Sequence, residues 1–235
     1  MNIGLVTIAY NGYGRFLPQW CKLIASMEKK PTKVTAVLGL NHGLSDTTEA
    51  ACKKLVPGIK IIHAEKAKCV MGNLRNIAVK YTNTEWIQFL SVDDMILPHA
   101  IVEYEKYAQD ADYICIRWLT RGLGKPETLH ISPLPVDMAK RHGKGFIVAH
   151  SPFKRWLWEK SPYEAHDYPN QPFVAHCVVN GARFVQTKLP CTVYLRRPDS
   201  HARTVLRGKN PVKGERQKAV YHKKRMEKMI HEYFA

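Results

Sequence analysis

Short apolar runs alternate with amphipathic stretches through the first 110 residues of the chain. The apolar runs have the length of buried strands, and the stretches between them repeat apolar residues at helical spacing. Strands are predicted over 3–10, 33–40, 60–64 and 85–92, and helices over 15–27, 45–56 and 72–82. This alternation predicts an α/β fold with a mainly parallel central sheet and helices on both faces.

Three polar side chains lie at the carboxyl ends of predicted strands: Tyr10, Asn41 and Asp93. Because ligands of parallel sheets bind beyond the carboxyl ends of the strands, we expect these side chains to lie at one binding edge. The glycine patterns of the common phosphate-binding loops are missing, since NGYG is not G-x-G-x-x-G and the chain has no P-loop. The sequence therefore argues against a Rossmann or P-loop protein.

The segment FLSVDDMILP at 89–98 ends an apolar run in two adjacent carboxylates, Asp93 and Asp94. A buried strand end with two carboxylates is costly unless a cation or hydrogen-bond donors compensate the charges. Such a pair suits a hard divalent cation that also holds phosphate oxygens. The alternative is that Asp94 caps the helix predicted over 96–108.

The pattern loosens after residue 110, where a strand at 112–120 precedes a loop-rich stretch at 121–136. Further along we expect a short strand and the start of a basic, aromatic helix within 143–163, then a helix ended by Gly181 and two strands around Pro190. The last predicted helix, 217–235, has an apolar stripe that docks it on the fold and a basic face left outside. The chain is divided accordingly into a ligand-binding half at 1–110, a second half of the same domain at 111–202 and a basic helical extension at 203–235.

Positive charge is the second strong signal in the sequence. Lys and Arg number 36 against 20 Asp and Glu, a formal net charge of +16, and residues 203–235 alone carry ten Lys or Arg against three Glu. Such an excess favours polyanionic partners: nucleic acid, an anionic membrane face or nucleotide phosphates. The six cysteines show no pairing pattern, and no apolar run reaches the ~20 residues of a membrane span. A cytoplasmic protein is expected.

Five segments in order resemble the GT-A glycosyltransferases of family 2. They are VTIAYNGYGRFLPQWCKLIAS, GLNHGLSDTT, GNLRNIAVKYTNTEWIQFLSVDDMILPHAI, HDYPNQPFVAHCVVNGARFVQ and YLRRPDSHAR, and together they span roughly residues 3 to 203. The resemblance implies a GT-A fold and an enzyme that transfers a sugar from a nucleotide-diphosphate sugar, with a UDP-sugar as the expected donor and Mn²⁺ or Mg²⁺ as the cofactor.

The resemblance also implies roles for residues on the donor side. Asp94 corresponds to a metal ligand and Asp93 to a donor-binding residue, although Ser91 replaces the first acid of the family's D-x-D motif. His201 is a candidate further metal ligand. Arg75 resembles the arginine that approaches the diphosphate, a use that suits its bidentate fork.

The nucleoside pocket is implied at Thr7, Ala9, Tyr10 and Asn41. Asn41 stands where the family usually has an aspartate that reads uracil. On the acceptor side, Asp167 matches the catalytic base of an inverting transfer, which takes the hydroxyl proton as the new bond forms. Its alternative role is to cap the helix that begins near Pro169.

The acceptor is inferred from the charge and from the segment FKRWLWEK, where Phe153, Trp156 and Trp158 interleave with basic residues. Such aromatic faces either stack bases or pack in the core. Compact basic family 2 enzymes resemble phage glycosyltransferases of hydroxymethylated pyrimidines in DNA, so DNA is the expected acceptor and the host cytoplasm the expected site. One alternative is a lipopolysaccharide or capsule glycosyltransferase that contacts the cytoplasmic membrane face peripherally through its basic helix. Another is a non-catalytic nucleic-acid-binding module.

Overall fold

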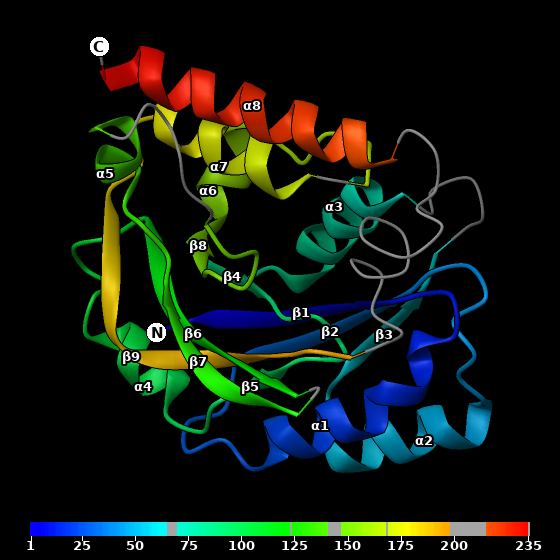
Figure 1. Cartoon of the computed structure of the whole chain (residues 1–235). Helices are drawn as coiled ribbons and strands as arrows, with labels where there is room; N and C mark the ends of the chain where they lie inside the picture. Colours follow the sequence, from blue (N-terminus) through cyan, green and yellow to red (C-terminus); the bar gives the residue numbers. More distant parts are fainter. Residues whose placement is uncertain (65–69, 123, 141–146, 168, 198–214, 235) are drawn as a thin grey trace.

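The computed structural model describes the chain apart from residues 65–69, 123, 141–146, 168, 198–214 and 235, and apart from the side chains of 215, 216, 218 and 219. One nine-stranded sheet runs through the molecule in the order β3-β2-β1-β4-β8-β6-β9-β5, with β7 paired to β6 (Figure 1). The predicted α/β class is confirmed, and the same sheet continues through both halves of the chain.

The N-terminal half is the parallel part of the sheet. Its strands are β1 (Ile3–Ala9), β2 (Lys33–Leu38), β3 (Lys60–His63) and β4 (Trp86–Phe89), and every pairing among them is parallel. Between them lie the 3₁₀ turn η1 (Tyr13–Phe16) and the helices α1 (Leu17–Ala25), α2 (Asp46–Leu55) and α3 (Met71–Thr82). Ser45 caps α2 by accepting the Thr48 N–H. These elements agree with the predicted order.

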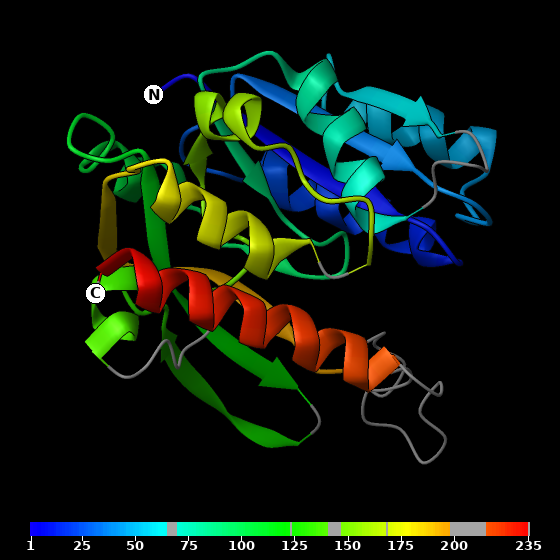
Figure 2. The same cartoon turned by 90° about the horizontal axis from the view of Figure 1, so that it is seen from above.

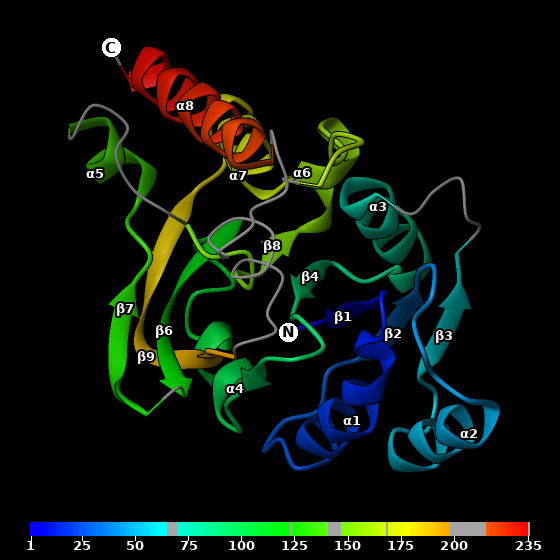
Figure 3. The same cartoon turned by 45° about the vertical axis from the view of Figure 1, so that its right-hand side comes forward.

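Helices cover both faces of the sheet, and each face has its own hydrophobic core. On one face α1 and α2 pack against alternate residues of β1, such as Leu5, with Trp20 fully buried between them. On the other face α3 packs against Val6 and Phe89 (Figure 3). The strand residues therefore bury both faces, which explains their near-continuous apolar runs.

The C-terminal half of the sheet mixes parallel and antiparallel pairs. It contains β5 (Met95–Ile96), β6 (Tyr113–Gly122), β7 (Lys125–Ile131), β8 (Phe153–Lys154) and β9 (Phe184–Leu195), with helices α4 (Ala100–Glu105), α5 (Pro135–Lys140), α6 (Arg155–Lys160) and α7 (Asn170–Val179). Only β6 and β9 pair in parallel here, whereas β4–β8, β6–β8, β6–β7 and β5–β9 are antiparallel. The parallel character of the prediction is thus confined to the N-terminal half.

Two element predictions in this half are wrong. The stretch 121–136 was expected to be loop-rich, but its middle forms β7, whose side chains are almost all exposed because it pairs only with β6 at the sheet edge. Such a strand lacks the apolar run that identifies a buried one. The two strands expected around Pro190 are one strand, β9, because the register with β6 shifts where Pro190 faces Arg117.

The final helix, α8 (Glu215–Phe234), lies along α7 (Figure 2). Met226 and Ile230 of its predicted stripe are fully buried in the second core, whereas Tyr233 is exposed. Lys223, Lys224 and Lys228 point away from this contact and are exposed, as predicted for the basic face. No helix among the described residues is long and apolar enough to cross a membrane.

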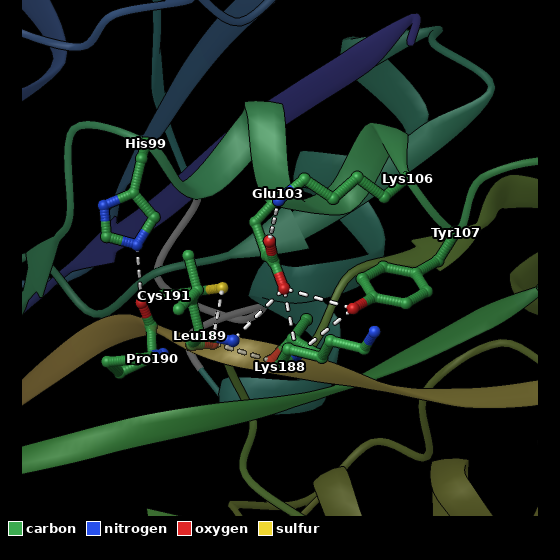
Figure 4. Close-up of polar contacts among 9 residues, drawn as sticks. His99, Glu103, Lys106, Tyr107, Lys188, Leu189, Pro190 and Cys191 are labelled. Carbon is green, nitrogen blue, oxygen red and sulfur yellow. Dashed lines mark hydrogen bonds and ion pairs between the residues drawn. The ribbon is translucent and has the colours of Figure 1, made fainter.

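A buried carboxylate joins α4 to β9 (Figure 4). Glu103 is 1% exposed, and its Oε1 accepts the backbone N–H groups of Lys188 and Leu189 at 2.9 and 3.1 Å and the Tyr107 hydroxyl at 3.2 Å. Lys106 donates to its other oxygen at 2.6 Å. This junction anchors the middle of β9 to α4. The last residue of β9, Leu195, contacts Asp94.

Candidate active site

The loops that follow β1 and β2 are joined by backbone hydrogen bonds at the carboxyl edge of the sheet. Gly12 N–H donates to the Asn41 carbonyl at 2.6 Å and Gly14 N–H to the His42 carbonyl at 2.7 Å. Asn41 has a φ of +52°, a left-handed conformation that asparagine tolerates, and it is exposed. The loops after β1 and β2 therefore lie together at this edge, and Asn41 is exposed there.

Tyr10 is the point at which the predicted site residues meet. Burial and, to a smaller degree, the charges of Asp167, Tyr13 and Asp93 together raise the pKa of Tyr10 to about 12, while the Arg75 guanidinium opposes them. These charges act on one phenol from three separate segments of the chain. The structure thus brings together Tyr10, Asp93, Arg75 and Asp167 around one position.

Thr7 and Ala9, the other predicted pocket residues, are buried on β1. The Thr7 hydroxyl oxygen is inaccessible to solvent and makes no hydrogen bond within the described part of the chain. A buried hydroxyl without a partner carries a desolvation cost that a ligand group can offset.

The two carboxylates of the 93–94 pair have different surroundings. Asp94 is 3% exposed, and both of its oxygens have protein partners: Leu195 N–H donates to Oδ1 at 2.9 Å, and His150 Nε2 lies 3.2 Å from Oδ2. Ser91, in the place of the missing acid, has its hydroxyl 3.2 Å from the same His150 nitrogen. Asp94 does not cap a helix, because α4 starts only at Ala100 with His99 at its N-cap.

Asp93 is the more accessible member of the pair. It forms an ion pair with Arg197, which follows β9, and the Arg197 guanidinium also lies 4.1 Å from the centre of the Phe16 ring. Burial and then the charge of Asp94 raise the pKa of Asp93, while Arg197 and His150 lower it. Two carboxylates in contact favour a nearby cation, and Arg197 supplies one.

Arg75 is buried on α3 between two aromatic rings. Its guanidinium carbon lies 4.7 Å from the ring centre of Phe89 and 5.2 Å from that of Tyr163, and one terminal nitrogen donates to Asn170. Its Nε makes no hydrogen bond with any described residue. Contact with two rings limits the directions in which the remaining N–H groups of this guanidinium can point.

Asp167 is exposed and lies at the start of α3. Its Oδ1 accepts the Met71 N–H at 3.2 Å, and the neighbouring His166 carbonyl accepts the Gly72 N–H at 3.0 Å. The alternative role at the helix near Pro169 is wrong, since no side chain caps α7. Asp167 instead holds the first turn of a different helix, and that turn fixes its position beside Tyr10.

Two other predictions have different outcomes. His201 lies outside the described residues. In FKRWLWEK, Phe153 is buried in the second core and Trp158 donates its indole N–H to Asn76 at 2.8 Å, so both rings contribute to packing. Trp156 is only half-buried, with the Lys160 ammonium 5.1 Å from its ring centre.

The sequence did not single out His150 or Arg197 as site residues. His150 lies in an irregular stretch without a motif, and it reaches Asp94 only because the chain folds back before β8. Arg197 belongs to the segment YLRRPDSHAR. Its two adjacent arginines indicate a basic site, but the sequence does not show which residue Arg197 contacts.

Solved structures share this fold. S. aureus TarS 1-349 matches with a TM-score of 0.66 and 14% identity over 83% of this chain and 60% of that one. Its complex with UDP-GlcNAc gives 0.67 and 15%, over 86% and 60%. A mycobacterial protein gives 0.62 and 12%, over 86% and 69%. The chain therefore spans about 60% of the length of the first two structures.

These likenesses define the class of fold, which is that of the GT-A glycosyltransferases, as predicted. The sequence identifies the group within it: the family model described as glycosyl transferase family 2 matches residues 5–176. The chain belongs to glycosyl transferase family 2. No curated protein matches its sequence.

Proposed function

We propose that the chain is a nucleotide-sugar-dependent glycosyltransferase that inverts the transferred anomeric carbon. The observation that carries this proposal is the convergence of Asp93, Arg75 and Asp167 on Tyr10 in a chain of family 2. Two of these groups lie on the donor side, and the third is a carboxylate on the acceptor side. The set has the charges that displacement of a nucleotide diphosphate requires.

A UDP-sugar is the proposed donor. One solved structure with this fold is a complex with UDP-GlcNAc. In this chain the Arg75 Nε is buried without a hydrogen-bond partner among the described residues, and a donor phosphate that reaches it would satisfy it. The nucleoside would then lie over Ala9 and Tyr10, with Asn41 at the rim of its pocket.

Mn²⁺ or Mg²⁺ is the proposed cofactor, and the residues present fit it in part. Asp93 would hold the ion together with the donor phosphates, while Asp94, whose oxygens are already bonded, would position the turn behind it. When bound, the ion would act as a Lewis acid on the leaving diphosphate. Arg197, now paired with Asp93, would have to share or release that carboxylate. The remaining lone pairs of Asp94 and the imidazole of His201 are the further ligands that the family resemblance implies.

The chemical step assigns one task to each group. The acceptor hydroxyl oxygen bonds to the anomeric carbon as the bond from that carbon to the diphosphate oxygen breaks, and the electron pair leaves with the diphosphate. Asp167 takes the hydroxyl proton on the acceptor side. Arg75 stabilises the charge that develops on the departing phosphate.

A hydroxymethylated pyrimidine in DNA is the proposed acceptor, with the reaction in the cytoplasm of a phage-infected cell. The net charge of +16 and the exposed lysines of α8 support a polyanionic partner. Phe153 lends no support because it is buried, and Trp158 is half-buried against the second core with its indole N–H bonded to Asn76. A base within a duplex has to be flipped out to reach such a site.

Asp167→Asn tests the proposed mechanism directly. We expect it to lower sugar transfer about 10²–10⁴-fold, the range for loss of a general base, because the amide cannot take the hydroxyl proton. The affinity for UDP measured by calorimetry should not change. The measurement is transfer of radiolabelled sugar from a panel of nucleotide sugars to duplex DNA that contains hydroxymethylated pyrimidines, with Asp137→Asn on α5 as the control. Near-normal transfer by the Asp167→Asn variant would remove Asp167 as the base.

A further inference from the structure

A cluster of imidazoles and one carboxylate lies where α8 contacts the segment that precedes α7. Glu164, His166 and His222 are half-buried, and one possible ligand atom from each lies within 4.8 Å of the others. His166 Nε2 is 3.2 Å from Glu164 Oε2. The rings of His166 and His222 are stacked, with their centres 3.8 Å apart and 16° between their planes, so one ring has to turn before both can direct a nitrogen at the same ion.

We propose that Glu164, His166 and His222 form a binding site for Zn²⁺, separate from the donor metal. Two imidazoles and a carboxylate are a ligand set that Zn²⁺ favours over Mg²⁺, which prefers oxygen ligands alone. At bond lengths of about 2.0–2.2 Å, the ligand atoms of a tetrahedral zinc lie about 3.4 Å apart. The Glu164–His166 pair already has this spacing.

Outer contacts orient the carboxylate for this role. His176, on α7, places its Nε2 3.3 Å from Glu164 Oε1, so it supports the oxygen opposite the one that faces His166. Partners of this kind fix the direction of a ligand and strengthen metal binding. Arg225, one turn beyond His222, donates to Glu164 Oε2 at 2.9 Å and therefore competes with a metal ion for that atom.

The position gives the site a consequence for the fold. His222 belongs to α8, whereas Glu164 and His166 belong to the segment that continues directly into Asp167. An ion bound by all three would tie the basic helix to the part of the chain that carries the proposed base. This role is structural, and it does not depend on the proposed sugar transfer.

Co²⁺ tests the site, because it replaces Zn²⁺ and absorbs visible light when bound by nitrogen and oxygen ligands. The full chain without a histidine tag is stripped with a chelator and titrated with Co²⁺, followed by Zn²⁺. We expect a visible band that saturates at one Co²⁺ per chain and disappears as Zn²⁺ displaces it. Absence of the band, or its persistence after excess Zn²⁺, would overturn the proposal.

Matched variants separate the site from adventitious binding by other histidines. His222→Ala should weaken Co²⁺ binding more than about 100-fold, since even loss of an outer partner costs 10–100-fold. His231→Ala, on an exposed face of the same helix, should leave it unchanged. Arg225→Gln should tighten binding, because it releases Glu164 Oε2. If His222→Ala does not fold, as judged by circular dichroism, His166→Asn takes its place with the same expectation. Equal affinity in the wild type and these ligand variants would contradict the proposal.

Discussion

Adjacent carboxylates in this protein have different tasks, although their sequence positions give no sign of it. Asp94 accepts hydrogen bonds that hold the end of β9, and Asp93 faces the site beside Tyr10. The sequence led us to rank Asp94 first as a metal ligand. Because each Asp94 oxygen already has one protein partner and Asp93 is the more exposed of the two, we propose Asp93 as the principal ligand.

This difference predicts opposite effects of two matched substitutions. Asp94→Asn should lower the free energy of unfolding by about 1–3 kcal/mol, since the amide cannot accept from both Leu195 and His150. Asp93→Asn should change stability little and abolish the dependence of donor hydrolysis on Mn²⁺. Urea unfolding and a metal titration of hydrolysis measure the two effects. The assignment fails if Asp94→Asn removes metal dependence while leaving stability intact.

Gly72 determines how closely the first turn of α3 approaches the segment 164–167. A Cβ at Gly72 would lie 1.8 Å from the Glu164 carbonyl oxygen, a backbone atom that cannot rotate away. This close approach lets Met71 and Gly72 donate to Asp167 and His166. The first turn of α3 is therefore the element that places the proposed base.

Gly72→Ala should displace the 164–167 segment. We expect a loss of about 1–3 kcal/mol in stability, typical of overpacking, and a fall in transfer of about 10²-fold, since a misplacement of 1 Å has that effect. Gly58→Ala is a suitable control: its φ of +83° also makes alanine costly, but it lies in a turn at the other end of the sheet. Thermal unfolding and transfer assays distinguish them. Equal transfer by the two variants at equal stability would contradict the placement role of Gly72.

The α4–β9 junction predicts a pH dependence of stability. Burial opposes ionisation of Glu103, but hydrogen bonds from Lys106, Leu189 and Lys188 outweigh it and lower the pKa of Glu103 below its ordinary value. A lowered folded-state pKa stabilises the protein above the unfolded pKa of about 4.3, and this contribution is lost as the pH falls through the folded pKa.

Glu103→Gln removes this titration. At pH 7 the variant should be about 1–2 kcal/mol less stable than the wild type, because a neutral amide accepts hydrogen bonds less strongly than a carboxylate. The difference should shrink between about pH 5 and pH 3 as the wild-type carboxylate is protonated. Urea unfolding at a series of pH values measures it. A difference that stays constant with pH would exclude Glu103 as its source.

The elements that the sequence predicted well are those whose burial leaves a pattern. The four parallel strands and α1 to α3 follow from their apolar runs and helical spacing. Strand β7 was missed because its exposed side chains have no such pattern. The contacts of Asp94 with His150 and Leu195 join residues 56 and 101 positions apart, so only the folded chain reveals them.

At the scale of the whole molecule, the two halves of the sheet carry different parts of the proposed site. The parallel half carries the predicted donor pocket, and the mixed half carries Asp167 and supports α8. Helix α8, which carries the exposed lysines, packs along α7 in the proposed acceptor half (Figure 2). If DNA is the acceptor, these lysines should contact its phosphates.

The salt dependence of DNA binding tests this arrangement. Replacing Lys223, Lys224 and Lys228 by glutamine should reduce the slope of log affinity against log salt by about 0.9 for each phosphate that the variant no longer neutralises. The matching change at Lys53, Lys54 and Lys60 removes the same charge from α2 and β3, away from α8. It should leave the slope almost unchanged if direct contact with phosphates rather than net charge determines binding. Fluorescence anisotropy with duplex DNA at several salt concentrations measures both.

Equal slopes in the two variants would show that net charge alone attracts DNA. Binding to anionic vesicles without DNA affinity at low salt would instead favour an acceptor at the membrane face.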